Sequence, residues 1–243
     1  NNLSNGTKLY GIENSELPLV QFYLRIDGGQ LLDQENKKGT ASLVANLMEE
    51  GTKSKTPAEL EEAIDLLGSS ISISAGLESI GISGNSLAKN LEATLDLVNE
   101  ILTEPRWDEQ AFDIAKTRRL ASIQQVKGNP QSLAFNALNK KLYGEDHPSA
   151  TPLGGTTDSV ESITMSDLKA YFNANISPKV AHFHIVGNIN ENEAVKVLSN
   201  FNKKWQGESV EIPTVEMVDA PSKPIVYFID IPDAKQSAIT VGT

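Results

Sequence analysis

The side chains that could carry chemistry in this chain are few. It contains three histidines and no cysteine, so disulfides, thiolate metal sites and cysteine nucleophiles are excluded. His182 and His184 flank Phe183 in a stretch with strand character, and residues two apart share one face of a strand. The pair could therefore hold a metal ion together. Because no carboxylate lies nearby in the sequence, we favour two hydrogen-bonded or exposed imidazoles, and metal binding remains the alternative.

The third histidine and a basic cluster offer two further candidate sites. His147 stands in a predicted loop, where we expect it to be a structural turn residue. Lys116, Arg118 and Arg119 lie together in an otherwise acidic protein. They could dock an acidic partner or a carboxylate. On a long exposed helix, however, solvation and ion pairing are the more usual role of such a cluster.

The remaining candidate catalytic side chains are five glutamates and one serine. The carboxylates are Glu49, Glu50, Glu59, Glu61 and Glu62. Without a basic or histidine partner nearby in the sequence, they are typical of solvated helix faces. Ser42 could act as a nucleophile only with a base within reach, and all three histidines lie far along the chain from it. We therefore expect neither group to be catalytic.

The stretch from Gly39 to Thr52 is predicted to form a helix of the protein core. Its apolar residues recur at helical spacing and form one face, which consists of Leu43, Val44, Leu47 and Met48. The other face carries Ser42, Ala45, Asn46 and Glu49.

This helix resembles the metal-bearing helix of the pitrilysin or insulinase-type zinc metallopeptidases, whose motif reads G-x-A-H-x-x-E-H-x-x-x-x-G-T. In that motif two histidines at i and i+4 bind Zn²⁺ and the glutamate between them activates the bound water. With Gly39 and Thr52 as anchors, the histidine positions hold Ser42 and Asn46, and the glutamate position holds Ala45. The family's third ligand, a glutamate on a later helix, falls near Ser122. The resemblance thus implies that every catalytic group is missing.

Other segments are similar to the same family in the same order. The opening Leu3-Ser4-Asn5-Gly6 resembles its L-x-N-G start, and Gly144 to Pro148 resembles its Y-G-x-x-H-P loop. Ser149 departs from that loop, because the family usually has an aromatic residue there. The resemblance covers nearly all of residues 1–243.

The resemblance implies an α/β fold of the α+β type, with a mostly antiparallel sheet covered by helices, and the order of strands and helices expected from periodicity agrees with it. Strands are expected at residues 17–26, 70–75, 80–82 and 180–186. Helices are expected at residues 56–67, 86–104, 108–126, 131–143, 168–172 and 191–205. The resemblance implies the same architecture, that of a domain of the pitrilysin or mitochondrial-processing-peptidase type.

The resemblance and the composition together predict three segments. Residues 1–206 would form the first, inactive pitrilysin-like domain, and the polar, proline-punctuated residues 207–223 a linker. Residues 224–243 carry two strand patterns, 224–229 and 236–242, that would open a truncated second homologous domain.

Composition bounds the classes of function. With 243 residues and 39% hydrophobic content, the chain can bury a sizeable core. No apolar run approaches the length of a membrane span. The net charge of −11 repels phosphate backbones, which disfavours nucleic-acid binding. A chain without cysteine is compatible with a bacterial periplasm, although its composition does not assign a compartment.

The resemblance implies a role as well as a fold. In the family, two similar halves close like a clamshell around an extended peptide, and only one half carries zinc. This chain is predicted to belong to the silent half, inactive alone and without a cofactor of its own. Its partner would be the zinc-bearing half, either on the same polypeptide or as a separate subunit, and the substrate a peptide. Two alternatives are an active metallopeptidase whose displaced site uses His147, His182 and His184, and a purely structural assembly subunit.

Overall fold

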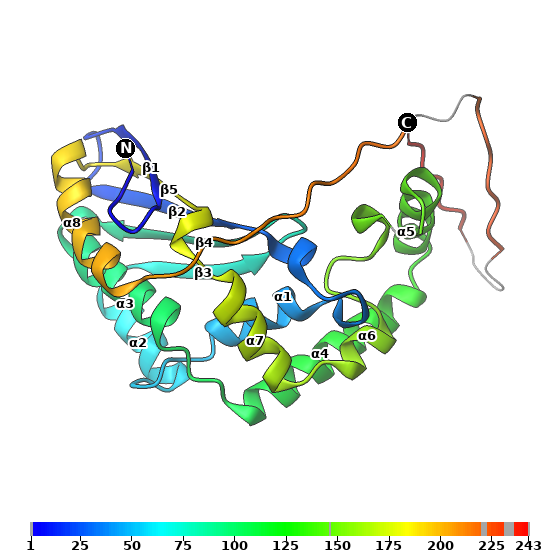
Figure 1. The fold of residues 1–243 in the computed structure, drawn as a ribbon, viewed down its shortest axis with the longest axis horizontal. Helices are drawn as coiled ribbons and strands as arrows, with labels where there is room; N and C mark the ends of the chain where they lie inside the picture. The colour runs from blue at the N-terminus through cyan, green and yellow to red at the C-terminus, as the bar shows by residue number, and fades with distance from the viewer. Residues whose placement is uncertain (1, 146, 220–222, 231–235, 243) are drawn as a thin grey trace.

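The computed structural model describes residues 2–145, 147–219, 223–230 and 236–242. A five-stranded sheet lies at one end of the molecule, and the helices continue away from it towards α5 (Figure 1). None of the helices in these ranges combines the length and the apolar character that a bilayer crossing requires.

The sheet has the order β1-β5-β2-β4-β3. Its strands are β1 (Lys8–Glu13), β2 (Leu19–Asp27), β3 (Ser70–Ala75), β4 (Ser79–Leu87) and β5 (Ala181–Gly187). Only the β1–β5 pair is parallel, and the three other pairs are antiparallel. The predicted mostly antiparallel sheet is therefore confirmed.

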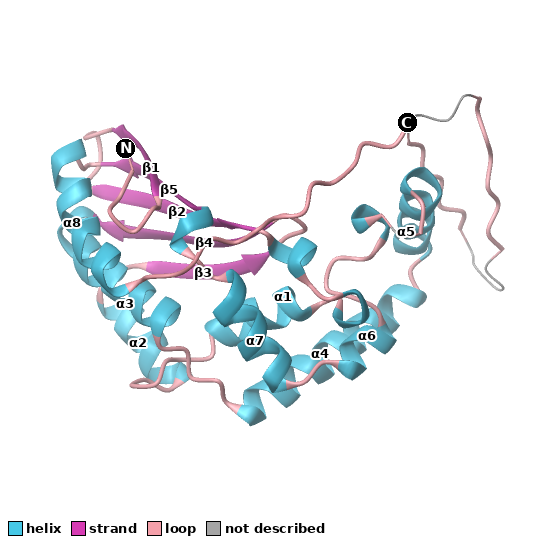
Figure 2. Ribbon diagram, in the orientation of Figure 1, coloured by secondary structure: helices cyan, strands magenta, loops and turns pink. Residues whose placement is uncertain are grey.

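Alternation of side chains explains why one face of the sheet is buried. In the central strand β2, every second residue is almost fully covered, namely Val20, Phe22, Leu24 and Ile26. Phe183 and Ile82 continue this buried face on the two neighbouring strands, where both are registered against Leu24. Helices gather on this side of the strands (Figure 2), so the core lies between the sheet and the helices.

The described residues contain eight α-helices, and each of them except α5 contributes buried side chains to this core. They are α1 (Thr40–Met48), α2 (Pro57–Leu66), α3 (Leu91–Thr103), α4 (Glu109–Lys127), α5 (Pro130–Tyr143), α6 (Thr157–Ser162), α7 (Met165–Asn175) and α8 (Glu191–Lys204). Short 3₁₀ turns connect them at η1 (Gly29–Leu32), η2 (Glu35–Lys37), η3 (Ala88–Asn90), η4 (Pro148–Ala150) and η5 (Pro178–Val180).

Local sequence signals account for several helix starts. At α2, Thr56 and Glu59 form a reciprocal capping box and Pro57 occupies the first helical position. At α4, the Asp108 side chain accepts a hydrogen bond from the backbone N–H of Ala111 at 3.0 Å. These caps satisfy amide groups that have no partner within the helix.

Two predicted boundaries are wrong. The helix expected from residue 86 begins at Leu91, because β4 extends to Leu87 and pairs there with Leu19 of β2. The helix expected over residues 168–172 is longer, since α7 begins at Met165 behind its cap, Thr164. Strand pairing sets the first boundary and a helix cap sets the second. The spacing of hydrophobic residues reveals neither of these causes.

The two C-terminal strand patterns do not form strands. Described residues 223–230 and 236–242 have no regular secondary structure, and Val226 and Phe228 are 93% and 90% exposed. A strand is stable only when its backbone groups pair with a neighbour, and these segments pair with none of the described strands. Instead, residues 236–242 pass beside α5 (Figure 1). In residues 223–230, the centre of the Tyr227 ring lies 5.2 Å from the ammonium group of Lys141 on α5.

A buried carboxylate fixes the start of α1. Asp33 accepts hydrogen bonds from the backbone N–H groups of Gly39 at 2.7 Å and Ala41 at 2.8 Å, so it caps the helix from a preceding loop. Gly39 is required here, because its φ is +105° and a Cβ would stand 2.6 Å from the carbonyl oxygen of Gly154. Burial raises the pKa of the Asp33 carboxyl from 3.8 to about 6, against the opposing effect of these hydrogen bonds.

We expect Asp33 to make the stability of the fold fall as pH rises. The folded state binds the proton more tightly than the unfolded state, so its contribution is complete below about pH 4 and is lost as pH rises through about 6. A shift of this size corresponds to roughly 3 kcal/mol. Urea unfolding of the wild type and of Asp33→Asn at pH 4, 5, 6 and 7 measures the effect.

The difference in unfolding free energy between the two proteins should change with pH, because the other carboxylates are common to both. A difference that stays constant from pH 4 to 7 would show that the Asp33 carboxyl has an unperturbed pKa.

Candidate functional site

The three positions of the zinc motif lie on α1, but they are not equally accessible. Ser42 is partly buried and Asn46 is exposed, whereas Ala45 is only 1% exposed. Ala45 is therefore covered, although the helical spacing places it on the face opposite Leu43, Val44, Leu47 and Met48. Helices α4 and α7 and strand β3 all contact α1, so they enclose most of its circumference and cover the short alanine side chain.

Arg119 of α4 lies beside the first of these positions. Its Nη2 donates a hydrogen bond to Oγ of Ser42 at 2.5 Å. The guanidinium also packs on the loop after η4, where a Cβ at Gly154 would stand 2.7 Å from Nη1. Burial lowers the pKa of Arg119, but arginine remains charged in proteins. A permanent positive charge thus lies where the resembled motif would place its metal ion.

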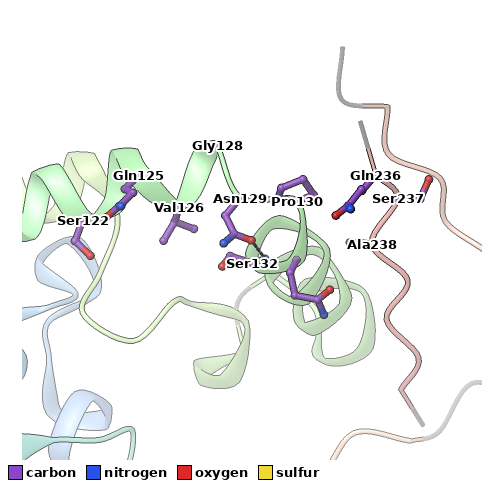
Figure 3. A pocket seen from close by; sticks show the side chains of 11 residues that line it. Ser122, Gln125, Val126, Gly128, Asn129, Pro130, Ser132, Gln236, Ser237 and Ala238 are labelled. Atoms are coloured by element: carbon purple, nitrogen blue, oxygen red, sulfur yellow. Dashed lines mark hydrogen bonds between the residues drawn. The ribbon is translucent and has the colours of Figure 1, made fainter. Parts of the chain in front are cut away.

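Ser122, the position expected for the third ligand, lies one turn after Arg119 on α4 and is exposed. It borders a hollow of about 630 Å³ formed by the end of α4, the start of α5 and residues 236–238. Figure 3 shows Gln236 and Ser237 opposite Asn129 and Pro130 at this junction. The described residues that line the hollow include no residue of α1, so it does not reach Ser42, Ala45 or Asn46.

The predicted basic cluster does not act as one unit. Lys116 donates from Nζ to the carbonyl oxygens of Glu161 at 2.8 Å and Ile163 at 2.7 Å, so it binds the end of α6. Arg119 points towards Ser42, and Arg118 is exposed. Three neighbouring cations therefore have three different environments, because they point in different directions around α4.

His182 and His184 lie on the same face of β5, as predicted. Nε2 of His182 is 3.1 Å from Oδ2 of Asp27 on β2. Tyr10 stacks on both imidazoles, with ring centres 6.1 Å from His182 and 5.0 Å from His184. These contacts correspond to the hydrogen-bonded, surface alternative for the two histidines, and Asp27 is the one carboxylate bonded to either ring among the described contacts.

His147 makes contacts within its own loop. Its Nδ1 accepts a hydrogen bond from the backbone N–H of Ser149 at 3.1 Å, and its ring stacks on Tyr143 with centres 5.0 Å apart. Since Nδ1 is the acceptor, Nε2 carries the proton and donates to the carbonyl oxygen of Glu216 at 3.1 Å. The geometry is that of a turn residue which also holds the following segment.

The carboxylates contact backbone groups or solvent. Glu49 accepts from the backbone N–H of Ile73 on β3 at 2.6 Å, and Glu59 belongs to the α2 capping box. Glu61 and Glu62 are exposed. None of these contacts is the carboxylate–histidine arrangement that general acid–base catalysis or zinc binding uses.

The residues present do not fit a zinc ion. Zinc prefers imidazole, thiolate and carboxylate ligands, whereas α1 offers a hydroxyl, a methyl and an amide at Ser42, Ala45 and Asn46. The guanidinium of Arg119 would also repel a divalent cation placed at Ser42. Within the described ranges, no three His, Cys, Asp or Glu side chains form a cluster that could hold a metal.

Comparison with known proteins identifies the family of the chain. Residues 12–157 match the family described as Insulinase (Peptidase family M16), and residues 162–243 match the one described as Peptidase M16 inactive domain. The first match covers more than half of the chain. The chain belongs to the insulinase family, peptidase family M16. The recognition made from the helix motif is thereby confirmed.

Curated insulinase-family relatives carry both peptidase and non-peptidase names. The non-peptidase homolog YmxG of Helicobacter pylori is 26% identical over 231 residues, which are 95% of this chain and 52% of that protein. A probable mitochondrial-processing peptidase subunit beta of Arabidopsis thaliana is 24% identical, over 85% of this chain and 39% of that protein. An uncharacterized zinc protease of Rickettsia bellii is 21% identical, over 99% and 57%. The chain spans about half the length of such relatives.

Solved structures of the family confirm the fold class. A peptidase M16 inactive domain from Pseudomonas fluorescens superposes with a TM-score of 0.82 at 24% identity, covering 88% of this chain and 52% of that one. A protease from Helicobacter pylori superposes with a TM-score of 0.80 at 18% identity, covering 90% and 53%.

One contact at the site was not predicted from the sequence. The basic cluster was noticed, but the pairing of Arg119 with Ser42 was not. A signal existed, because Arg119 stands three residues before Ser122 and therefore lies on the same face of α4. That face had already been assigned to the metal position.

We expect purified protein that has been stripped of metal by a chelator to bind no zinc tightly. The donor set at α1 is unsuitable and carries a positive charge, so calorimetric titration with Zn²⁺ should show no site tighter than roughly micromolar, or about 8 kcal/mol. Substitution of His182 and His184 by alanine serves as the control, and it should leave the titration unchanged. One tight equivalent that disappears in that variant would establish a displaced metal site.

Proposed function

We propose that this insulinase-family chain belongs to a non-catalytic half of a zinc peptidase. In this role it helps to enclose extended peptides, which a zinc-bearing partner half hydrolyses. The observation that carries the proposal is the set of residues at the zinc-motif positions of α1. Ser42, Ala45 and Asn46 occupy the three motif positions, and Arg119 binds Ser42 where the metal would lie.

The retained scaffold supports this role. Helix α1 keeps its buried apolar face, its capped start and its contacts with α4 and α7. The departures from the motif are confined to Ser42, Ala45 and Asn46 on this helix, so the chain can still form the wall of a chamber. The names of its relatives are compatible with the proposal, since one is a non-peptidase homolog and another is a subunit of a processing peptidase.

The partner we propose is a homologous half with an intact H-x-x-E-H motif, on the same polypeptide or as a separate subunit. Zinc would belong to that half, where it activates water for attack on the peptide bond. The compartment we propose is a bacterial periplasm, with which a chain without cysteine is compatible.

We expect peptide hydrolysis only from the assembled protein. The full chain alone should not cleave a pool of internally quenched fluorescent peptides in the presence of zinc. Addition of the homologous zinc-bearing half encoded beside it, or fused to it, should produce cleavage that chelators abolish. The measurement is the rate of fluorescence increase, with co-elution in size-exclusion chromatography as proof of assembly.

Replacing the partner's motif glutamate by glutamine is the control, because it removes the general base without removing the metal ligands. Chelator-sensitive cleavage by this chain alone would favour the active enzyme with a displaced site. Co-elution without any cleavage would instead favour the purely structural assembly subunit.

A further inference from the structure

The four arginines of the chain differ in how their charge is balanced. Arg25 is paired with Asp27 at 2.6 Å, and Arg106 with Asp108 at 3.6 Å. Arg118 is exposed, so water solvates its charge. Arg119 is partly buried, and none of the ion pairs among the described residues includes it.

The lack of a counter-charge at Arg119 is unusual in this chain. Acidic residues outnumber basic ones by 32 to 21, yet the one described polar partner of the guanidinium is the neutral hydroxyl of Ser42. Burial is also the one cause that shifts the pKa of Arg119, with no opposing contribution from a carboxylate. A guanidinium has five N–H donors, so most of its binding capacity is unused.

The surroundings hold this side chain in place. Ser42 fixes one edge of the guanidinium, and the backbone of Gly154 lies against it. Gly154 is itself anchored, because its N–H donates to Oε1 of the buried Gln30 at 2.9 Å. A preorganised arginine loses less freedom on binding than a mobile one.

The neighbouring helix positions add neutral donors. Asn46 follows Ser42 by one turn on α1, and Ser122 follows Arg119 by one turn on α4, and both are exposed. A hydroxyl and an amide can donate to an anion without neutralising it. These positions therefore present one cation together with polar, uncharged groups, and the Glu49 carboxylate on the same side of α1 is bonded to the backbone N–H of Ile73.

We propose that Arg119 and Ser42 form a binding site for a carboxylate of a peptide. The planar fork of arginine matches the two oxygens of a carboxylate. One cation balances one carboxylate, whereas a phosphate dianion would remain unbalanced in a protein of net charge −11. The carboxylate is that of a chain terminus or of an aspartate or glutamate side chain. The inference rests on the proposed function only for the peptide nature of the ligand.

The test is an NMR titration of the full chain, labelled with ¹⁵N-arginine, in which the Nε–H signals of the four arginines are followed. Three tetrapeptides distinguish the sources of the carboxylate. They are acetyl-tetraalanine with a free C-terminus, the same peptide as its C-terminal amide, and an amidated peptide in which glutamate replaces the third alanine. Acetate alone tests the charge without a peptide.

The Arg119 signal should shift in a saturable way with at least one carboxylate-bearing peptide and stay unchanged with the neutral amide. Arg119→Gln should weaken that binding by about tenfold or more, since a charge-assisted hydrogen bond is lost. Arg118→Gln is the matched control, because it removes the same charge one residue away and should leave the affinity within about twofold. Ser42→Ala should also weaken binding, because it frees the guanidinium.

A wild-type Arg119 signal that does not respond to any carboxylate would overturn the inference, and that result does not require any variant to fold. Equal losses in Arg118→Gln and Arg119→Gln would overturn it too, because the attraction would then be unspecific. Carboxylate binding that persists while the assembled protein fails to cleave peptides would refute the proposed function alone. Cleavage without carboxylate binding would refute this inference alone.

Discussion

The enclosure of α1 is the constraint on which the rest of this structure depends. Its buried residues Leu43, Val44, Leu47 and Met48 are at most 1% exposed, so their apolar side chains are removed from water. Asp33 satisfies the amides at one end of the helix. Near the other end, Glu49 accepts a hydrogen bond from Ile73 of the edge strand β3. The helix is held by packing and by contacts at both ends, and the end contacts of Asp33 and Glu49 do not involve the motif positions.

This arrangement explains how the catalytic groups can be absent without loss of the fold. In a chain whose core depended on a structural metal, removal of the ligands would unfold the site. Here the interface between α1 and α4 is formed by packed side chains and by the hydrogen bond between Arg119 and Ser42. Arg119 places a positive charge beside Ser42, and this charge does not depend on metal supply.

The histidines illustrate why residue type alone is a weak guide to chemistry. His182 and His184 share a strand face, as metal ligands would, but the neighbouring strands β1 and β2 place aromatic rings and one carboxylate around them. Tyr10 reaches these rings because β1 pairs with β5 in parallel, with Tyr10 registered against His184. The strand pairing thus converts a possible metal pair into a stacked aromatic surface.

Much of the fold could be predicted from the sequence, because its signals are local. Hydrophobic periodicity identified α1, β2 and β5, and cap residues such as Thr56 and Asp108 marked where helices begin. The boundary at residue 86 and the unpaired segments near residues 224 and 236 could not be predicted in this way. Their state depends on whether a partner strand lies beside them, which is a property of the whole chain.

For the candidate site too, some features could be predicted from the sequence and others depend on the tertiary structure. The sequence by itself determined that zinc chemistry is missing at α1, since metal ligation depends on residue type and Ser42, Ala45 and Asn46 have the wrong types. Only the tertiary structure decided what replaces it. Arg119 is 77 positions from Ser42 in the chain, and a contact over that separation exists only after α4 has packed on α1, because the helix spacing that a sequence reveals does not specify which helices become neighbours.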